Sequence, residues 1–123
     1  MFYEQDWILR QISIVIKFIR SLLSKEGNVY EQDEEQTVFK EEIEKLIELN
    51  RLKEANSLIV KISKDKDVLA LGLWFYDLLN DLSDKRLEEG ALAREDILKG
   101  LRTLLYNSDR VDNSVVDIII DKY

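Results

Sequence analysis

The feature that most constrains this chain is its first apolar segment, EQDWILRQISIVIKFIRSLL, at residues 4–23. Eleven of its twenty residues are large and apolar, and only five carry a charge. On a helical wheel the charged and small polar residues gather on one narrow strip. The apolar arc spans roughly 200°, twice the stripe of an ordinary surface helix. A strand is the poorer interpretation, because the alternation of period two fails across residues 14–16.

So wide an apolar arc must be shielded from water, and the sequence excludes some of the environments that could shield it. A membrane-spanning helix needs about 20 apolar residues with few charges, and Arg10, Lys17 and Arg20 interrupt the run. A signal peptide is not expected, because acids precede the run and no small-residue cleavage site follows it. We therefore expect protein to pack on two sides of this helix. A helix lying on a membrane surface is the alternative, since three bases occupy its polar strip.

The remainder of the chain also favours helices. It contains no proline and only four glycines, so few residues break a helix. Apolar periodicity predicts helices at about 37–50, 52–63, 65–82 and 94–106. The tail, 112–123, is assigned as a helix because Asp117 and Asp121 share one helical face, although its valines and isoleucines have strand propensity. Residues 83–93 are expected to form a connector with up to one helical turn.

These patterns predict one all-α domain over residues 1–123 with five to six helices. It comprises an N-terminal apolar helix at about 4–24, an acidic linker at 25–36 and a helical-hairpin region at 37–123. The short connection near Asn50 and Arg51 predicts an αα-hairpin. Gly72, inside a predicted helix, indicates the close approach of a neighbouring helix, and Gly100 permits a second such contact.

Charge and composition exclude several classes of function. The net charge of −7 divides into +1 over residues 1–24, −5 over residues 25–54 and −3 over the rest. An acidic protein repels phosphate backbones, so we expect no nucleic-acid partner. The chain has no cysteine and no histidine. It therefore lacks disulfides, thiolate metal sites, the commonest general base and the commonest transition-metal ligand.

Paired acids are the remaining candidates for chemistry. They occur at Glu41, Glu44 and Glu48, at Glu88 and Glu89, and at Asp117 and Asp121. Carboxylates alone can hold Mg²⁺ or Ca²⁺, so a metal-dependent enzyme is an alternative. We prefer to interpret these acids as solvated helix faces. Accordingly we predict no catalytic, cofactor-binding or metal-ligating residue, and no small-molecule ligand.

Two resemblances accompany this interpretation. LNRLKEANSLIVKI, within residues 36–69, resembles the middle of a tetratricopeptide unit, with Ala55 at the small position of the second helix. Glu42 stands where that unit usually has a large apolar residue, and no proline closes it.

QDWILRQI, LKEANSLI and LLNDLSDKRLEEGALAREDILKGL together resemble a family of short uncharacterised bacterial proteins, a domain of unknown function. These proteins begin with a Gln-Asp-aromatic-apolar-apolar-Arg run. The resemblance covers most of the chain and implies an all-helical fold in a bacterial cytoplasm. It implies no activity and no catalytic residue.

The width of the first apolar arc leads to a functional prediction. Each large apolar side chain left in water loses about 1.5–3 kcal/mol of burial free energy. A small bundle has too few helices to cover both sides of the first helix. We expect a cytoplasmic, non-enzymatic interaction or scaffold module that forms a homodimer by an isologous contact or binds another protein. A peripheral membrane protein is the alternative. The predicted contact residues are Tyr3, Trp7, Ile8, Leu9, Ile12, Val15, Ile16, Ile19 and Leu23.

Overall fold

The structure is a computed structural model that describes residues 2–25 and 34–122. Within these ranges the chain forms seven helices and no strand, so the all-α prediction is confirmed. The helices are α1 (Phe2–Lys25), α2 (Glu34–Glu48), α3 (Leu52–Ser63), α4 (Leu69–Asn80), α5 (Asp84–Glu89), α6 (Arg94–Asn107) and α7 (Asn113–Lys122). The tail is therefore a helix. Most of the predicted acidic linker, residues 26–33, lies outside the described residues.

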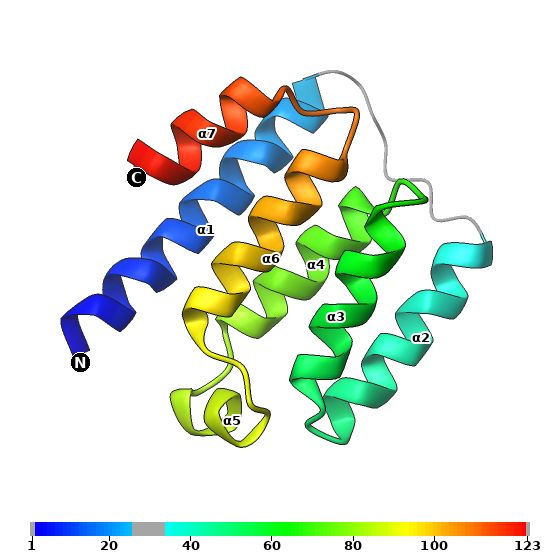
Figure 1. Cartoon of the computed structure of the whole chain (residues 1–123), viewed down its shortest axis with the longest axis vertical. Coiled ribbons are helices and arrows are strands. Elements are labelled where there is room, and N and C mark those ends of the chain that lie inside the picture. Colours follow the sequence, from blue (N-terminus) through cyan, green and yellow to red (C-terminus); the bar gives the residue numbers. More distant parts are fainter. Residues whose placement is uncertain (1, 26–33, 123) are drawn as a thin grey trace.

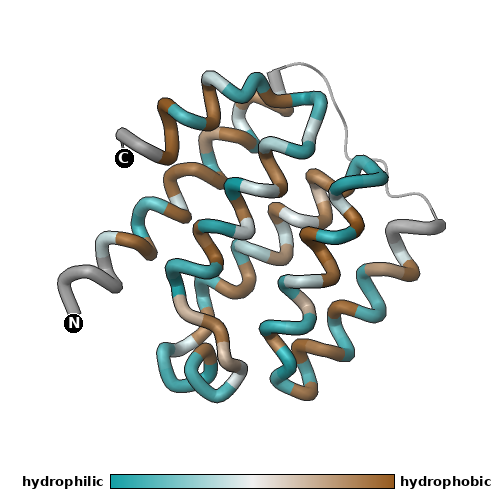
Figure 2. The backbone as a smooth tube through the Cα atoms, in the orientation of Figure 1, coloured by the Kyte–Doolittle hydropathy of each residue, from teal (hydrophilic) through white to brown (hydrophobic). Residues whose placement is uncertain are grey.

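The helices pack around a central pair, α4 and α6 (Figure 1). α1 packs against both members of this pair, and α7 packs against α1 and α6. On the other side α3 packs against α6, and α2 packs against α3. Figure 1 places α1 and α2 on opposite sides of the molecule, running in opposite directions. Hydrophobic and hydrophilic positions alternate along the helices (Figure 2), as expected when each buries one stripe in a shared core.

Two glycines set the spacing of the central helices. A Cβ atom at Gly72 of α4 would overlap the side chain of Leu104 on α6. A Cβ atom at Gly100 of α6 would meet the hydroxyl of Tyr76 and the amide of Asn56. Both sites are buried, so a larger residue would push the helices apart. Side chains from neighbouring helices therefore occupy the space beside both glycines.

α2 and α3 follow one another through a tight turn, and they pack together as the predicted αα-hairpin. Asn50 supplies the turn with a φ of 56°, a left-handed conformation that asparagine adopts more readily than most residues. Arg86 of α5 holds this turn, because its guanidinium donates to the carbonyl oxygen of Ile47 at 3.0 Å. The tetratricopeptide-like register of residues 36–69 stays a prediction.

The count of five to six helices is too low, because α5 forms in the segment assigned as a connector. Its N-cap residue, Ser83, accepts a hydrogen bond from the backbone N–H of Arg86 at 3.2 Å, which satisfies a donor of the first turn. α5 ends near Gly90, and the next residue, Ala91, has a φ of 58°. A helix of six residues is too short for apolar periodicity to reveal.

Candidate functional site

α1 divides into a buried face and an exposed face. Side chains on the buried face have at most 8% of their surface exposed, and they belong to the core that α4, α6 and α7 complete. Two polar contacts fix α1 on α4: Arg20 forms an ion pair with Asp77 at 3.2 Å, and the Asn80 amide donates to the Leu9 carbonyl oxygen at 3.1 Å. The exposed face is therefore presented on a helix that is firmly held.

Three large apolar side chains line the exposed face. Trp7 is 58% exposed, Ile14 is 46% exposed and Phe18 is 43% exposed. Their spacings of seven and four residues place them along one line of the helix. We call these three residues the α1 stripe. Isolated exposed apolar residues are ordinary on a protein surface, whereas three aligned on one helix indicate a contact surface.

The α1 stripe has unlike neighbours on its two sides. Arg10 and Lys17 are exposed along one side of it. On the other side Gln11 is buried, and its amide nitrogen donates to the carbonyl oxygen of Ile120 on α7. The stripe therefore lies between a pair of basic residues and the helix α7.

Most residues of the predicted contact set are not on this surface. Six of them are buried in the core of the chain itself: Ile8, Ile12, Val15, Ile16, Ile19 and Leu23. Leu9 is half-buried, Trp7 is exposed, and the side chain of Tyr3 lies outside the described residues. Helices of the same chain cover the six, which removes them from any surface that a partner could touch in this fold.

Sequence reasoning missed Ile14 and Phe18. Two features of the sequence could have indicated that these residues are exposed: their spacing from Trp7, and their position beside Arg10 and Lys17 on the helical wheel. The sequence predicts that the other helices of the chain cover only one side of the arc, but it does not indicate which side they cover. The helical wheel identifies the apolar arc, but only the packing of the other helices shows which part of it remains exposed to solvent.

The outward side of α2 is mainly acidic, whereas the exposed charged residues described on α1 are basic. Val38 is 54% exposed and Leu49, in the turn just after the helix, is 66% exposed. Between them the exposed charged residues are Glu41, Glu42, Glu44, Lys45 and Glu48, four acids and one base. We call Val38 and Leu49, with Lys45 on the line between them and Glu41 and Glu48 beside it, the α2 face.

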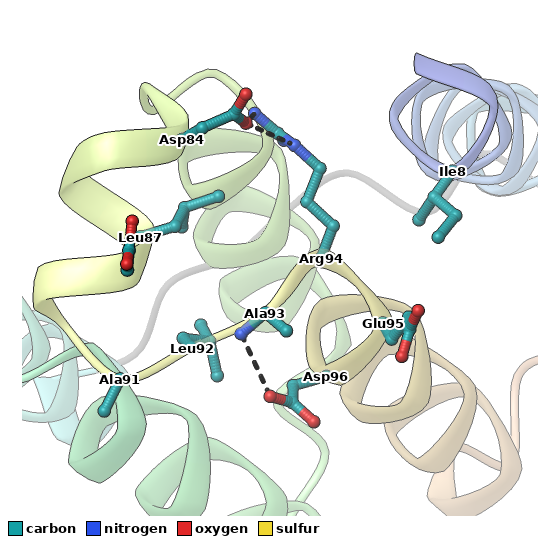
Figure 3. A pocket seen from close by; sticks show the side chains of 10 residues that line it. Ile8, Asp84, Leu87, Ala91, Leu92, Ala93, Arg94, Glu95 and Asp96 are labelled. Atoms are coloured by element: carbon teal, nitrogen blue, oxygen red, sulfur yellow. Dashed lines mark hydrogen bonds and ion pairs between the residues drawn. The ribbon is translucent and has the colours of Figure 1, made fainter. Parts of the chain in front are cut away.

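A hollow of about 520 Å³ lies where α5, the start of α6 and Ile8 of α1 meet (Figure 3). Its polar groups hold the fold together. Arg94 is 8% exposed and donates to Asp84 at 2.9 Å and to the carbonyl oxygens of Asn80 and Leu82 at 3.1 Å. Asp96 accepts from the backbone N–H of Ala93 at 3.0 Å, which caps α6. The described lining contains no serine, threonine, tyrosine or lysine, and its charged residues are four acids and Arg94.

The predicted acid pairs do not assemble. Within residues 2–25 and 34–122, no three carboxylates are grouped as metal ligands would be. Glu41, Glu44, Glu48, Glu88, Glu89 and Asp117 are all exposed, and the side chain of Asp121 lies outside the described set. None of the helices described is long and apolar enough to cross a bilayer.

A buried phenol stands apart from these exposed acids. Tyr76 lies in the core, and its hydroxyl donates to the side-chain oxygen of Asn56 at 2.7 Å. Burial raises the pKa of Tyr76, because a charged phenolate loses hydration there. The group therefore stays neutral and serves as a hydrogen-bond donor between α4 and α3.

Comparison with known proteins adds one relationship. The model of a family of unknown function, DUF6483, matches residues 2–108. That range includes the α1 stripe, the α2 face and the hollow beside α5. No curated protein and no solved structure matches the chain.

Proposed function

Because the chain belongs to the DUF6483 family, a family of unknown function, we propose its function from its own surface. It is a non-enzymatic protein–protein interaction module, and it self-associates through the α1 stripe. The observation that supports this proposal is the alignment of three large exposed apolar side chains, Trp7, Ile14 and Phe18, along one helix. Covering each would recover part of the roughly 1.5–3 kcal/mol that full burial of such a side chain yields.

The character of the stripe also supports the proposal. Tryptophan is among the residues that most often dominate binding energy at interfaces, and arginine is enriched there. Trp7 and Arg10 provide one of each at the amino-terminal end of the stripe. Because α1 is held by its own core, a partner would meet a preorganised surface, which lowers the entropy cost of association.

Sedimentation velocity over a range of micromolar concentrations tests the proposal. We expect the wild-type chain to show a rising average mass, and the double variant Trp7→Ser/Phe18→Ser to remain a monomer. Circular dichroism of the dilute variant serves as the control, because both side chains are exposed and their loss should leave the fold intact. A wild type that stays monomeric, or a double variant that associates equally well, refutes self-association through the stripe.

A second candidate is favoured by a specific observation. Trp7 and Phe18 lie beside Arg10 and Lys17, and aromatic and basic residues together are typical of faces that lie on anionic membranes. Flotation with vesicles containing an anionic lipid separates the two functions. Peripheral membrane binding requires that the wild type floats and that Trp7→Ser/Phe18→Ser does not.

We propose the cytoplasm as the site of this activity. A chain without cysteine has no need of an oxidising compartment to form disulfides. Fractionation of the native host tests this assignment, and recovery of the protein with the membrane fraction would favour the second candidate.

A further inference from the structure

We propose that the partner of the α1 stripe is the α2 face of a second copy, so that chains associate head to tail. This inference rests on the proposed function, because it requires the α1 stripe to be a contact surface. It adds the identity of the opposing surface, which that proposal leaves open. The argument uses spacing, charge and the directions of the two helices.

The apolar residues at the two ends of each surface have matching spacing, whereas Ile14, in the middle of the α1 stripe, lies opposite Glu42 in this register. Trp7 and Phe18 are eleven residues apart on α1, and Val38 and Leu49 are eleven residues apart on α2 and the turn after it. At 1.5 Å per residue both pairs span about 16 Å along the helix axis. All four residues are at least 43% exposed. An antiparallel pairing can therefore place Trp7 opposite Leu49 and Phe18 opposite Val38 at the same time.

The same register brings opposite charges together. Position 46 then lies opposite Arg10, and position 39 lies opposite Lys17. Along the helix axis, Glu48 is therefore about 3 Å from Arg10, and Glu41 is about 3 Å from Lys17. Arg10 and Lys17 lie roughly 60–80° to one side of the α1 stripe, and Glu41 and Glu48 lie roughly 70–90° to the same side of their own apolar line. Antiparallel helices bring these equivalent sides together, which forms two pairs of opposite charge. Such pairs favour the correct partner and register. Lys45 lies on the line between Val38 and Leu49, near the point opposite Arg10, and Glu41 and Glu48, four and three residues away, offset its charge.

An antiparallel contact between two copies of α1 is less favourable. Placing Trp7 opposite Phe18 of the other copy brings Arg10 within about 3 Å, along the axis, of the other copy's Lys17. Two like-charge pairs then flank the contact, and such pairs disfavour an interface. Among the described side chains of α1 the exposed charged residues are Arg10 and Lys17 alone, and both are basic. The α2 face is net acidic, with Lys45 within one turn of Glu41, Glu42 and Glu48.

The fold supplies the required direction. α1 and α2 lie on opposite sides of the molecule and run in opposite directions (Figure 1). A second copy placed beside the first by translation alone therefore sets its α2 antiparallel to the first copy's α1. The contact is heterologous, so each added chain leaves one α1 stripe and one α2 face open at the ends of the assembly. Such contacts produce open chains or closed rings.

Charge reversal with complementation tests the inference. The base-reversed chain carries Arg10→Glu and Lys17→Glu, and the acid-reversed chain carries Glu41→Lys and Glu48→Lys. Sedimentation velocity should show each reversed chain alone associating at least about tenfold more weakly than the wild type. An equimolar mixture should recover association, because each stripe then meets a face of opposite charge. Added salt should weaken the wild-type association.

Matched controls reverse the same number of charges elsewhere. Lys53→Glu/Lys99→Glu alters two exposed bases on α3 and α6, and Glu88→Lys/Glu89→Lys alters two exposed acids at the end of α5. Both should associate like the wild type. Equal thermal midpoints for all four variants, measured on dilute protein, confirm that each is folded.

The outcomes separate this inference from the proposed function. If Trp7→Ser/Phe18→Ser is monomeric while the acid-reversed chain associates like the wild type, the stripe contacts another surface, and this inference alone is wrong. A mixture of reversed chains that fails to recover association also overturns it. If the wild type never associates, self-association and its head-to-tail form are both refuted.

Discussion

Leu104 of α6 lies directly over Gly72 of α4, where a Cβ atom on the glycine would overlap the Cδ atoms of the leucine. Both residues are buried, so neither can move aside into solvent. We expect Gly72→Ala to destabilise the protein by about 1–2 kcal/mol, because overpacking typically costs 1–3 kcal/mol and the higher helix propensity of alanine returns at most about 1 kcal/mol. Urea unfolding measures the change. In the background of Leu104→Ala the same substitution should become neutral or stabilising, and equal losses in both backgrounds would contradict the overlap.

A second prediction concerns the turn after α5. A Cβ atom at Gly90 would overlap Leu52, whereas Ala91 holds a φ of 58° that favours glycine. Ala91→Gly relieves a strain of roughly 1–2 kcal/mol and loses about 0.4–1 kcal/mol through the freer unfolded chain. We therefore expect Ala91→Gly to be neutral or stabilising by up to about 1.6 kcal/mol. Gly90→Ala should destabilise by roughly 1–3 kcal/mol. The reverse order in chemical denaturation would show that the turn has another conformation.

A third prediction concerns Arg94, which is 8% exposed and donates to Asp84, Asn80 and Leu82. Arg94→Met leaves two carbonyl oxygens without these donors and should cost about 2–3 kcal/mol of unfolding free energy. Asp84→Asn alters only an exposed partner and should cost less than about 1 kcal/mol. Thermal unfolding of the two variants gives the comparison. Equal losses would mean that the ion pair, and not the carbonyl contacts, holds α5 and α6 together.

The buried phenol of Tyr76 makes stability depend on alkaline pH. The pKa of Tyr76 is raised above its ordinary value of 10.0 by burial, so the folded state retains a proton that the unfolded state releases. The stabilising contribution of the neutral phenol is complete below pH 10.0 and is lost progressively as the pH rises above that value. Tyr76→Phe should reduce this alkaline loss, at a cost of about 1 kcal/mol near neutral pH from the missing hydrogen bond to Asn56. Unfolding curves collected between neutral and alkaline pH test the slope. A slope unchanged by the substitution would contradict the role of Tyr76.

Two adjacent residues of α1 provide a direct contrast. Phe18 is 43% exposed, whereas Ile19 is fully buried. We expect Ile19→Ala to cost about 2–5 kcal/mol, because it leaves a cavity in the core. Phe18→Ala should cost the dilute monomer only about 1 kcal/mol, because much of that side chain already lies in water. Urea unfolding at low protein concentration measures both, and a large loss at Phe18 would place that side chain within the core.

Local sequence patterns predicted much of the helical content. α3 begins and ends where apolar periodicity placed it, and α6 extends one residue beyond its expected end. The fourth helix begins at Leu69, later than expected, and the Leu69 N–H donates to the side-chain oxygen of Asp67 at 3.2 Å. The sequence pattern did not predict α5, because a single capping residue, Ser83, is a weaker local signal than a repeated apolar stripe.

What the sequence by itself determined is where the longer helices form, because periodicity, caps and the absence of proline act within a few residues. It also determined that α1 carries more apolar surface than one side of a helix needs. Only the tertiary structure decided that Ile12, Val15 and Ile19 enter the core while Trp7, Ile14 and Phe18 remain in water. The physical reason is that exposure depends on the placement of α4, α6 and α7, which are distant in sequence, and a helical wheel carries no information about neighbours. The opposite directions of α1 and α2 across the molecule belong to the tertiary structure for the same reason.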